Sequence, residues 1–433
     1  MGHARRWATV GVAALLVAGC GAGGSDEGSG RASGSTGAGT ATSEGGDAQG
    51  GGAKVPTFDP PKAFEPRGGI VLHSVKGDAS SPSEPMTPVA LSGTLVISYD
   101  PETQQLTAVD VMKEDQAWVL DSPVEAAPPQ GKSNPGPGLP PVVSEDGKTV
   151  YAAYSVRTPD SGTTKGGERG VAVAVDIATG KAKWTADLGA QGIGGGVRQL
   201  VGDRVVVWNR STSEGAHTWI LDASTGKTVL DRDGGITAAN DAIGTVVDVE
   251  FEGRFGRVVS LTDGKTLATV GDDVGKFEVI GSTDAGVLTT TNDWGSGEED
   301  RGFLLDPKAG TVRKELPGVT SPSEIQGANA ECTTTPGKAV AMCLGSGARG
   351  YDLATGRVVW DLFTKDRIAP SHVTQFHGQV YAVVDNNGSP SGVVIDGQTG
   401  KDIASGGLPV EVVNEHGGIL RAEGSGAFYF ANA

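Results

Sequence analysis

The stretch "GVAVAVDIATGKAKWTADLG", residues 170–189, decides how this chain is expected to fold. Two apolar runs flank a short polar loop, which is the pattern of two strands joined by a tight turn. In that loop Asp176 can accept hydrogen bonds from backbone amides two or three residues further on, and Gly180 can supply the left-handed conformation that closes the turn. Trp184 follows four residues after the glycine, where it can pack against a neighbouring unit.

Six further stretches repeat this pattern in the same phase. "RGYDLATGRVVW" and "TWILDASTGKTVL" keep the aspartate, the glycine and a large residue, whereas "RVVSLTDGKTLA" carries Ser260 in place of the aspartate. The earliest, "LTAVDVMKEDQAW", lacks the glycine but keeps the aspartate and the tryptophan at the same offsets. The repeat predicts these structural positions: Asp110, Trp118, Asp176, Gly180, Trp184, Asp222, Gly226, Gly264, Asp306, Gly310, Asp352, Gly356, Trp360, Asp396 and Gly400.

The spacing of the repeat indicates the architecture. Successive turn positions lie between 38 residues (222 to 260) and 66 residues (110 to 176) apart. A second hairpin signal, clearest in "PPVVSEDGKTVYAAY" and "TQFHGQVYAVVD", lies between successive turns. Each unit therefore holds four strands, and a four-stranded unit of about 40–50 residues is typical of a propeller blade. The 69 glycines and 23 prolines, without a long run at helical spacing, agree with an all-β chain.

Two strands at the ends of the chain have no partner within their own repeat. They are "GGIVLHSV", near 68–75, and "GAFYFANA" at the C-terminus. If three C-terminal strands accept the N-terminal one, the ring closes and no edge stays open. We therefore predict an all-β propeller of eight four-stranded blades, closed by pairing of the N- and C-terminal strands. Seven blades, with the terminal strands placed otherwise, is the alternative.

The repeat also resembles a known family. Residues 174–184 match A-x-D-x-x-x-G-K-x-x-W at every specified position, which is the tryptophan-docking pattern of the pyrroloquinoline-quinone-like (PQQ-like) β-propellers. The other copies match in part, and the similarity covers about 68–433. The resemblance implies the fold. It leaves function open, because this superfamily includes quinoprotein dehydrogenases, non-catalytic scaffold lipoproteins of the envelope and sensor domains.

The N-terminus predicts export and a lipid anchor. Arg5 and Arg6 precede an apolar run that ends in Val17-Ala18-Gly19-Cys20, which resembles the bacterial lipobox with Cys20 as the lipidated residue. An ordinary signal peptide with an incidental cysteine is the alternative. A Gly-, Ser- and Thr-rich segment follows, which buries too little apolar area to fold. We therefore divide the chain into a lipoprotein signal peptide, 1–19, a lipidated cysteine with a disordered tether, 20–57, and a propeller, 58–433.

The net charge bears on the class of partner, and the two remaining cysteines bear on disulfide formation. The formal charge of −17 becomes −19 (−17 − 2) once the two arginines of the signal are removed, which argues against a nucleic acid partner. Outside the cytoplasm Cys332 and Cys343 can form a disulfide, since a turn at Gly337-Lys338 sets them opposite each other. A redox pair is the alternative, although the spacing is unlike C-x-x-C.

Motifs for catalysis are missing from the sequence. The resemblance to quinoprotein dehydrogenases implies a quinone, a Ca²⁺ ion and, in some enzymes, two adjacent cysteines, but the chain has no Cys-Cys pair. There is no G-x-S-x-G and no H-E-x-x-H, and the histidines are scattered. The glycine run "GAQGIGGGVR" at 189–198 is expected to connect two strands. We therefore expect no enzyme activity, no cofactor and no metal site.

The functional hypothesis rests on the lengths of the loops between strands. The long insertions fall in second-to-third loops and blade-to-blade connections, which open on one face of a propeller: 76–87, 121–139, 157–169, 293–300 and 317–330. Neutral variation of surface loops is the other explanation. Trp294, in one of these insertions, is a possible partner contact. We expect a membrane-anchored, non-catalytic binding or scaffolding lipoprotein at the outer face of a bacterial cytoplasmic membrane, with a protein or envelope-polymer partner on the long-loop face. A quinoprotein dehydrogenase and a small-ligand sensor are the alternatives.

Overall fold

The computed structural model describes residues 61–432 with gaps at 63, 65–68, 73–87, 101–102, 114, 128–138, 164, 191–193, 211–215, 251–252, 271–275, 293–300, 320–330, 335–337, 345–346, 369, 386–389 and 423–425. All of these residues lie in one compact unit, Val55–Ala433. Among them no helix is long and apolar enough to cross a membrane.

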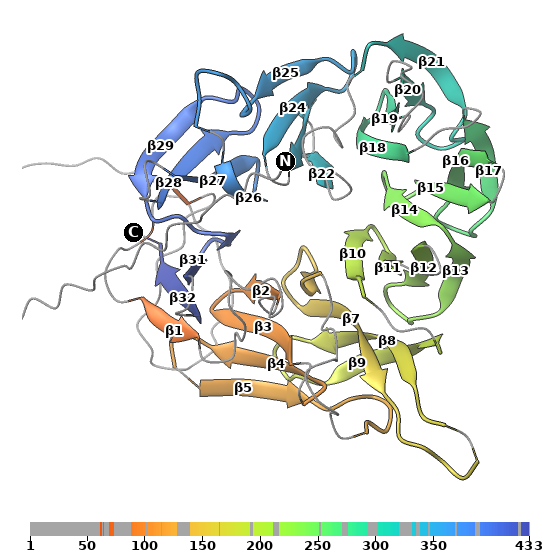
Figure 1. Ribbon diagram of the computed structural model, residues 1–433, viewed down its shortest axis with the longest axis vertical. Helices are drawn as coiled ribbons and strands as arrows, with labels where there is room; N and C mark the ends of the chain where they lie inside the picture. The colour runs from red at the N-terminus through yellow and green to blue at the C-terminus, as the bar shows by residue number, and fades with distance from the viewer. Residues whose placement is uncertain are drawn as a thin grey trace, which may run out of the picture. The chain divides into compact units, whose positions relative to one another are not determined.

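Eight four-stranded antiparallel sheets form the ring of a β-propeller (Figure 1). Blades 1 to 4 are β2–β5, β6–β9, β10–β13 and β14–β17: β2(Val89–Ser92), β3(Leu95–Asp100), β4(Gln105–Asp110), β5(Asp115–Leu120), β6(Val142–Val143), β7(Thr149–Arg157), β8(Glu168–Asp176), β9(Ala182–Gly189), β10(Gly196–Val201), β11(Arg204–Arg210), β12(Ala216–Asp222), β13(Thr228–Asp233), β14(Gly235–Ala238), β15(Ile243–Glu250), β16(Gly253–Ser260) and β17(Thr266–Val270).

Blades 5 to 7 are β18–β21, β22–β25 and β26–β29, and blade 8 has the order β1-β32-β31-β30. Their strands are β18(Lys276–Thr283), β19(Gly286–Asn292), β20(Arg301–Leu305), β21(Val312–Pro317), β22(Glu331–Thr334), β23(Val340–Leu344), β24(Ala348–Asp352), β25(Val358–Asp361), β26(Pro370–Phe376), β27(Gln379–Asp385), β28(Pro390–Asp396), β29(Asp402–Gly407), β30(Val412–Val413), β31(Gly417–Ala422), β32(Gly426–Ala431) and β1(Ile70–Leu72). Eight blades are confirmed, and the seven-blade alternative is wrong.

The ring closes as predicted, with three C-terminal strands accepting one N-terminal strand. β1 pairs antiparallel with β32, with Ile70 opposite Tyr429. The chain before β1 adds to this closure, because Phe64 forms an isolated bridge with Asn432 and is only 5% exposed. Phe64 also packs edge-on against Tyr381 of blade 7, whose hydroxyl donates to the carbonyl of Pro61 at 2.7 Å. The N-terminal segment therefore contacts two consecutive blades.

The hydrophobic core lies in the seams between blades. In one cluster Tyr151 and Ala172 of blade 2 pack with Val205 and Trp219 of blade 3, and the other seams repeat this arrangement. Each sheet therefore buries both of its faces, which explains why central strands such as β7 and β8 are continuous apolar runs rather than alternating ones.

The repeated tryptophan joins one blade to the next. The indole nitrogen of Trp184 in β9 donates to the carbonyl of Ala223 in blade 3 at 2.8 Å. Trp118 and Trp360 make the same bond to the following blade, to Ile177 at 2.8 Å and to Gly397 at 3.0 Å.

The glycine of the repeat receives that tryptophan. A Cβ on Gly226 would lie 2.6 Å from the Trp184 ring, and Gly226 has a φ of +70°. Gly180 and Gly400 bear the same relation to Trp118 and Trp360. Only glycine combines the left-handed backbone with room for the ring.

Candidate binding surface

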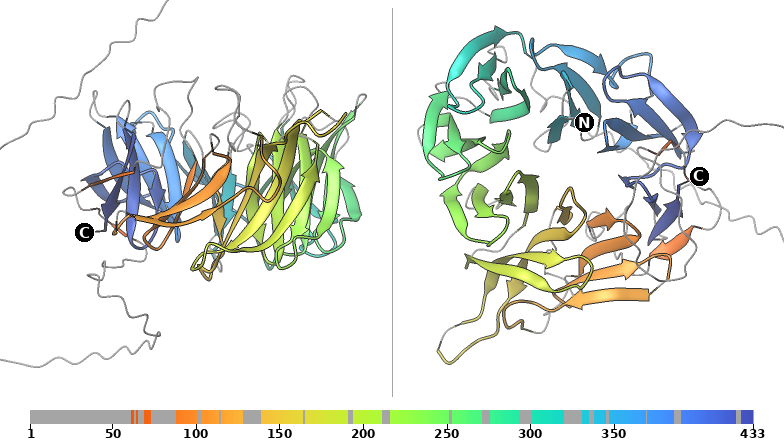
Figure 2. Two further views of the ribbon diagram at one scale, coloured as in Figure 1. Left: turned by 90° about the horizontal axis from the view of Figure 1, so that it is seen from below. Right: turned by 180° about the vertical axis from the view of Figure 1, so that it is seen from behind.

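Strand topology sorts the connections of the propeller onto two faces, and the strands run between them when the ring is seen edge-on (Figure 2). We call one the turn face: the described strand ends that lie there flank 93–94, 111–114, 144–148, 177–181, 202–203, 223–227, 239–242, 261–265, 284–285, 306–311, 335–339, 353–357, 377–378, 397–401 and 414–416. We call the other the connection face: the described strand ends that lie there flank 73–88, 101–104, 121–141, 158–167, 190–195, 211–215, 234, 251–252, 271–275, 293–300, 318–330, 345–347, 362–369, 386–389, 408–411 and 423–425.

The strand ends that flank the long connections all lie on the connection face. The longest connection between turn-face strand ends is 306–311, whereas connection-face strand ends flank 73–88, 121–141 and 318–330. The insertions expected at 76–87 and 293–300 lie outside the described residues. The insertion expected at 157–169 is shorter, because Arg157 belongs to β7 and β8 begins at Glu168. The one expected at 317–330 likewise begins after Pro317, which belongs to β21.

The β7–β8 hairpin is the described part of this face that extends farthest from the ring (Figure 1). Its tip, 158–167, is mostly exposed and is held by its own hydrogen bonds. The amide of Thr158 donates to the carbonyl of Gly167 at 2.9 Å, and the amide of Gly166 donates to a carboxylate oxygen of Asp160 at 2.7 Å. The conformation of the tip is therefore stabilised by hydrogen bonds within the tip itself.

A buried glutamine fixes the base of this hairpin. Gln104 is 1% exposed, and its side-chain amide donates to the carbonyl of Ala127 at 2.7 Å while its oxygen accepts the amide of Arg157 at 2.8 Å. Ala127 in turn donates its amide to the carbonyl of Arg157 at 2.7 Å. Gln104 has a φ of +57°, a conformation that non-glycine residues rarely adopt. This clamp between blades 1 and 2 has no signal in the sequence.

A second surface feature is apolar and lies at the rim between blades 6 and 7. Arg367 lies in the connection from blade 6 to blade 7, and its guanidinium donates to the carbonyl of Gly400 in blade 7 at 3.0 Å and pairs with Asp402 of the same blade. Five apolar side chains of β25, of the connection that follows it and of β29 are exposed by 37–51%: Val358, Val359, Phe363, Ile368 and Ile403.

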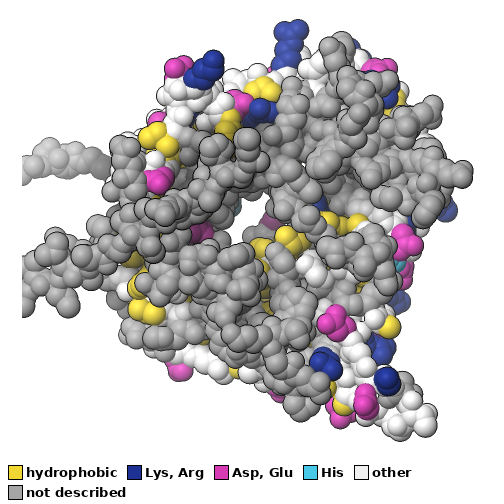
Figure 3. Space-filling view, viewed as in Figure 1, with side chains coloured by type: hydrophobic (Ala, Val, Ile, Leu, Met, Phe, Trp, Pro, Cys, Tyr) yellow, Lys and Arg dark blue, Asp and Glu magenta, His cyan; other side chains and the backbone are white. Residues whose placement is uncertain are grey.

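Two observations on the described residues concern metal ions and small ligands. No group of three or more His, Cys, Asp and Glu among them is arranged to hold a metal ion. A cavity beside Phe64 and Tyr381 measures about 20 Å³, room for about one water molecule. The space-filling view of the ring shows a hollow at its middle, with hydrophobic side chains along part of its edge (Figure 3).

The repeat aspartates lie on the turn face and hold its turns. A carboxylate oxygen of Asp222 accepts the amide of Thr225 at 2.9 Å and its hydroxyl at 2.8 Å, and Ser224 donates in the same way. These bonds, led by the hydroxyl of Ser224, lower the pKa of Asp222 to about 2. Equivalent carboxylate-to-amide bonds form at the other repeat aspartates: Asp110, Asp176, Asp306, Asp352 and Asp396.

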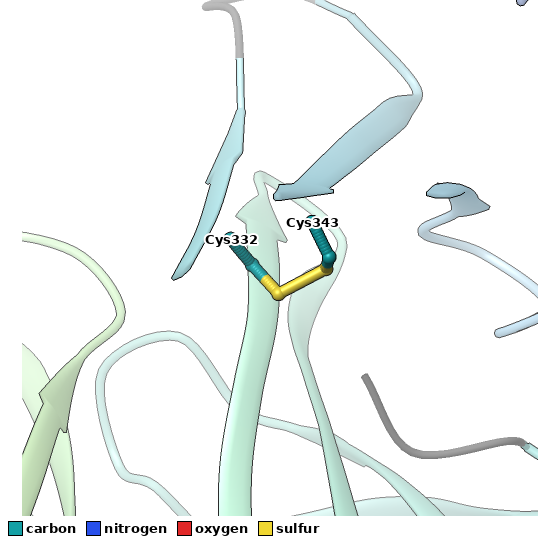
Figure 4. The surroundings of a disulfide bond; sticks show 2 residues. All are labelled: Cys332 and Cys343. Atoms are coloured by element: carbon teal, nitrogen blue, oxygen red, sulfur yellow. A yellow bond between two sulfur atoms is a disulfide. The ribbon is translucent and has the colours of Figure 1, made fainter. Parts of the chain in front are cut away.

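The two cysteines are joined by a disulfide across the inner strands of blade 6 (Figure 4). Cys332 of β22 lies opposite Cys343 of β23, and Cys343 is fully buried in the seam with blade 5. Cys20 and Trp294 lie outside the described residues.

Comparisons with known proteins concern the fold. A scan against family models found no match, and a search of curated proteins found no relative. Among solved structures the chain is similar to BamB from Moraxella catarrhalis, with 12% identity, a TM-score of 0.46 and 85% of this chain and 99% of that chain covered.

Two further solved structures are similar. For Sqt1 of Saccharomyces cerevisiae the identity is 8% and the TM-score 0.45, with 88% and 100% of the chains covered. For a europium-containing methanol dehydrogenase the values are 12%, 0.44, 83% and 85%. One of these proteins is named as an enzyme, and no function of this chain follows from any of the three similarities.

Proposed function

We propose that this protein is an exported, lipid-anchored β-propeller that binds a protein or envelope-polymer partner through its connection face, without catalysis. The observation that carries the proposal is the one-sided placement of the long connections. No turn-face connection is longer than 306–311, while the described strand ends that flank 73–88, 121–141 and 318–330 all lie on the opposite face. Binding residues are often carried on loops held by a rigid scaffold.

The framework under that face is rigid. Blades are joined through indole-to-carbonyl bonds at Trp118, Trp184 and Trp360, and through apolar seams. The Gln104 clamp ties the base of the β7–β8 hairpin to the segment that follows blade 1. A partner that meets this hairpin therefore meets a preformed surface, which lowers the entropic cost of binding.

The anchor complements this role. With Cys20 lipidated, the Gly- and Ser-rich segment that follows has a root-mean-square reach of about 30–35 Å, enough to hold the propeller clear of the bilayer. The mature charge of −19 (−17 − 2) keeps the domain in solution beside an anionic membrane.

Crosslinking in intact cells tests the proposal. The full chain is compared with a variant in which 158–167 becomes a two-residue Asn-Gly turn and 128–138 is removed, so that Ala127 and the Gln104 clamp are retained. The matched control replaces two exposed turn-face lysines, Lys181→Ala and Lys227→Ala. Captured partners are identified by mass spectrometry.

We expect a partner that is captured by the full chain and the lysine control and lost from the loop variant. Equal capture by all three proteins would overturn the assignment of the face. Capture of nothing, together with saturable binding of a quinone in the presence of Ca²⁺, would overturn the non-catalytic function.

A further inference from the structure

A row of polar side chains ends blade 3 at the connection face. Trp208 of β11 lies opposite Thr218 of β12, and Thr218 lies opposite Arg232 of β13. Directly opposed residues of an antiparallel sheet project from the same side of it. All three lie within two residues of the strand ends at 210, 216 and 233, where these strands meet the connection face.

That side of the sheet is the seam with blade 4. Val206, Ile220 and Leu230 lie two residues further along the same strands, and they pack in one apolar cluster with Ile236 and Ala238 of β14. The polar row therefore continues the apolar seam to its end at the connection face.

Two donors in this row have no acceptor. Nε1 of Trp208 and Nη1 of Arg232 are both buried without a hydrogen-bond partner, in the part of the chain that the structure describes. Thr218, which lies between them, uses its hydroxyl to donate to the carbonyl of Gly234 at 2.6 Å. Buried donors are normally paired in native proteins, so two orphans in one row point to an acceptor that comes from outside the chain.

A third donor approaches from the innermost strand. Arg198 sits at a bulge in β10, and its guanidinium lies 5.3 Å from the centre of the Trp208 ring. Among the described residues no carboxylate lies within ion-pair distance of Arg198 or Arg232, whereas Arg169, Arg204 and Arg349 each have one.

We propose that this end of the seam binds an oxyanion, either a carboxylate or a phosphate group, with Trp208, Arg198 and Arg232 as its donors. Arg232 and Trp208 lie two strands apart, about 10 Å across the sheet, so their long side chains can reach one acceptor. Guanidinium groups and an indole N–H only donate, and they match the lone pairs of an oxyanion. This inference deepens the proposed function, because a partner on the connection face can present the carboxylate; free phosphate is the other source.

The indole proton of Trp208 reports binding directly. The full chain, in detergent solution and labelled with ¹⁵N-tryptophan, is titrated with sodium phosphate and, separately, with an Asp- and Glu-rich peptide, both at constant ionic strength against sodium chloride. Trp208→Phe assigns the resonance and keeps the ring. Arg198→Gln and Arg232→Gln remove one charge each, and Arg357→Gln, at an exposed turn-face position, is the matched control.

We expect a saturable shift of the Trp208 resonance, with affinity reduced about tenfold in Arg198→Gln and Arg232→Gln and unchanged in Arg357→Gln. A shift with the peptide alone identifies a partner carboxylate, and a shift with phosphate identifies a free anion. No shift beyond that with chloride, or an equal shift in every variant of unchanged melting temperature, overturns the site and shows that water satisfies these donors. The crosslinking result is independent of this titration, so the two proposals fail separately.

Discussion

Substitutions at Trp184 and at Gly226, the glycine that its ring covers, test how much this contact contributes to the packing of blade 2 against blade 3. Trp184 is 8% exposed, and its ring covers Gly226 of the next blade. Trp184→Ala leaves a cavity and removes the 2.8 Å hydrogen bond to the carbonyl of Ala223, which keeps only the 3.4 Å bond from the Tyr151 hydroxyl. We therefore expect a loss of about 3–5 kcal/mol in the free energy of unfolding. Denaturant titration measures it, and an unchanged midpoint would contradict the docking role.

The glycine can be tested against a matched site. Gly226→Ala adds a Cβ 2.6 Å from the Trp184 ring at a φ of +70°, whereas Gly147, at a φ of +66°, has nothing within 4 Å of the added atom. Both variants incur the backbone cost of about 1 kcal/mol, and Gly226→Ala adds the clash. We therefore expect Gly226→Ala to lower the melting temperature more than Gly147→Ala. Equal losses would mean that backbone conformation alone selects this glycine.

The repeat aspartate predicts a pH dependence. The folded-state pKa of Asp222, about 2, lies below the value of about 3.9 in an unfolded chain. Its contribution to stability is therefore present above pH 4 and is lost as the pH falls towards 2. Asp222→Asn should be less stable than the wild type at neutral pH, and the difference should vanish near pH 2. Unfolding curves across this range check it, and a difference that persists at pH 2 would exclude the carboxylate as the cause.

At the scale of single elements, the disulfide holds the two innermost strands of blade 6. Cys332 and Cys343 are 11 residues apart in sequence, and closing a loop of this size in the unfolded chain stabilises by about 3 kcal/mol. The double variant Cys332→Ala with Cys343→Ala should therefore unfold at lower denaturant. Reducing agent should lower the midpoint of the wild type and leave that of the double variant unchanged, and an unaffected wild type would argue against the bond.

The short closing strand is the other element with a testable role. β1 spans only Ile70–Leu72, yet it covers the β32 edge, and Phe64 extends the contact to blade 7. A chain that begins at residue 73 should melt at a lower temperature and associate with increasing concentration, since an open edge recruits other strands. A chain that begins at residue 60 keeps the whole segment and is the control. Equal behaviour of the two would show that blade 8 is stable with three strands.

Sequence pattern revealed the elements that repeat and missed those that occur once. The blades were predictable because Asp, Gly and Trp recur in phase. Each of these residues has the same local role in every blade that keeps it. The Gln104 clamp was not predictable, because its three residues, Gln104, Ala127 and Arg157, are separated by up to 53 positions and share no spacing rule. The Arg198–Trp208 contact depends on a bulge in β10, and the sequence "GAQGIGGGVR" contains no pattern that predicts this bulge. Single long-range contacts do not recur at a fixed spacing in the sequence, and the Gln104 clamp and the Arg198–Trp208 contact are both of this kind.

At the scale of the whole molecule, the proposed function assigns different tasks to the propeller and to the N-terminal segment. The propeller would provide the binding face, and a lipid on Cys20 would hold it beside the membrane. A single acyl group binds a membrane weakly and two bind it stably. Loss of the thiol that would carry the diacyl group should therefore release the protein entirely rather than in part.

The variant Cys20→Ser tests whether membrane attachment depends on Cys20 and not on the propeller. We expect the wild type in the membrane fraction and Cys20→Ser in the soluble fraction, with the melting temperature of the propeller unchanged because the fold begins after the tether. The control is Ser25→Ala, a change in the same segment that leaves the cysteine in place. Crosslinking of Cys20→Ser should then yield less of the partner than the wild type does, since release from the membrane lowers the local concentration of the connection face. Membrane retention of Cys20→Ser would contradict the lipid anchor, and undiminished capture after release would place the partner in solution.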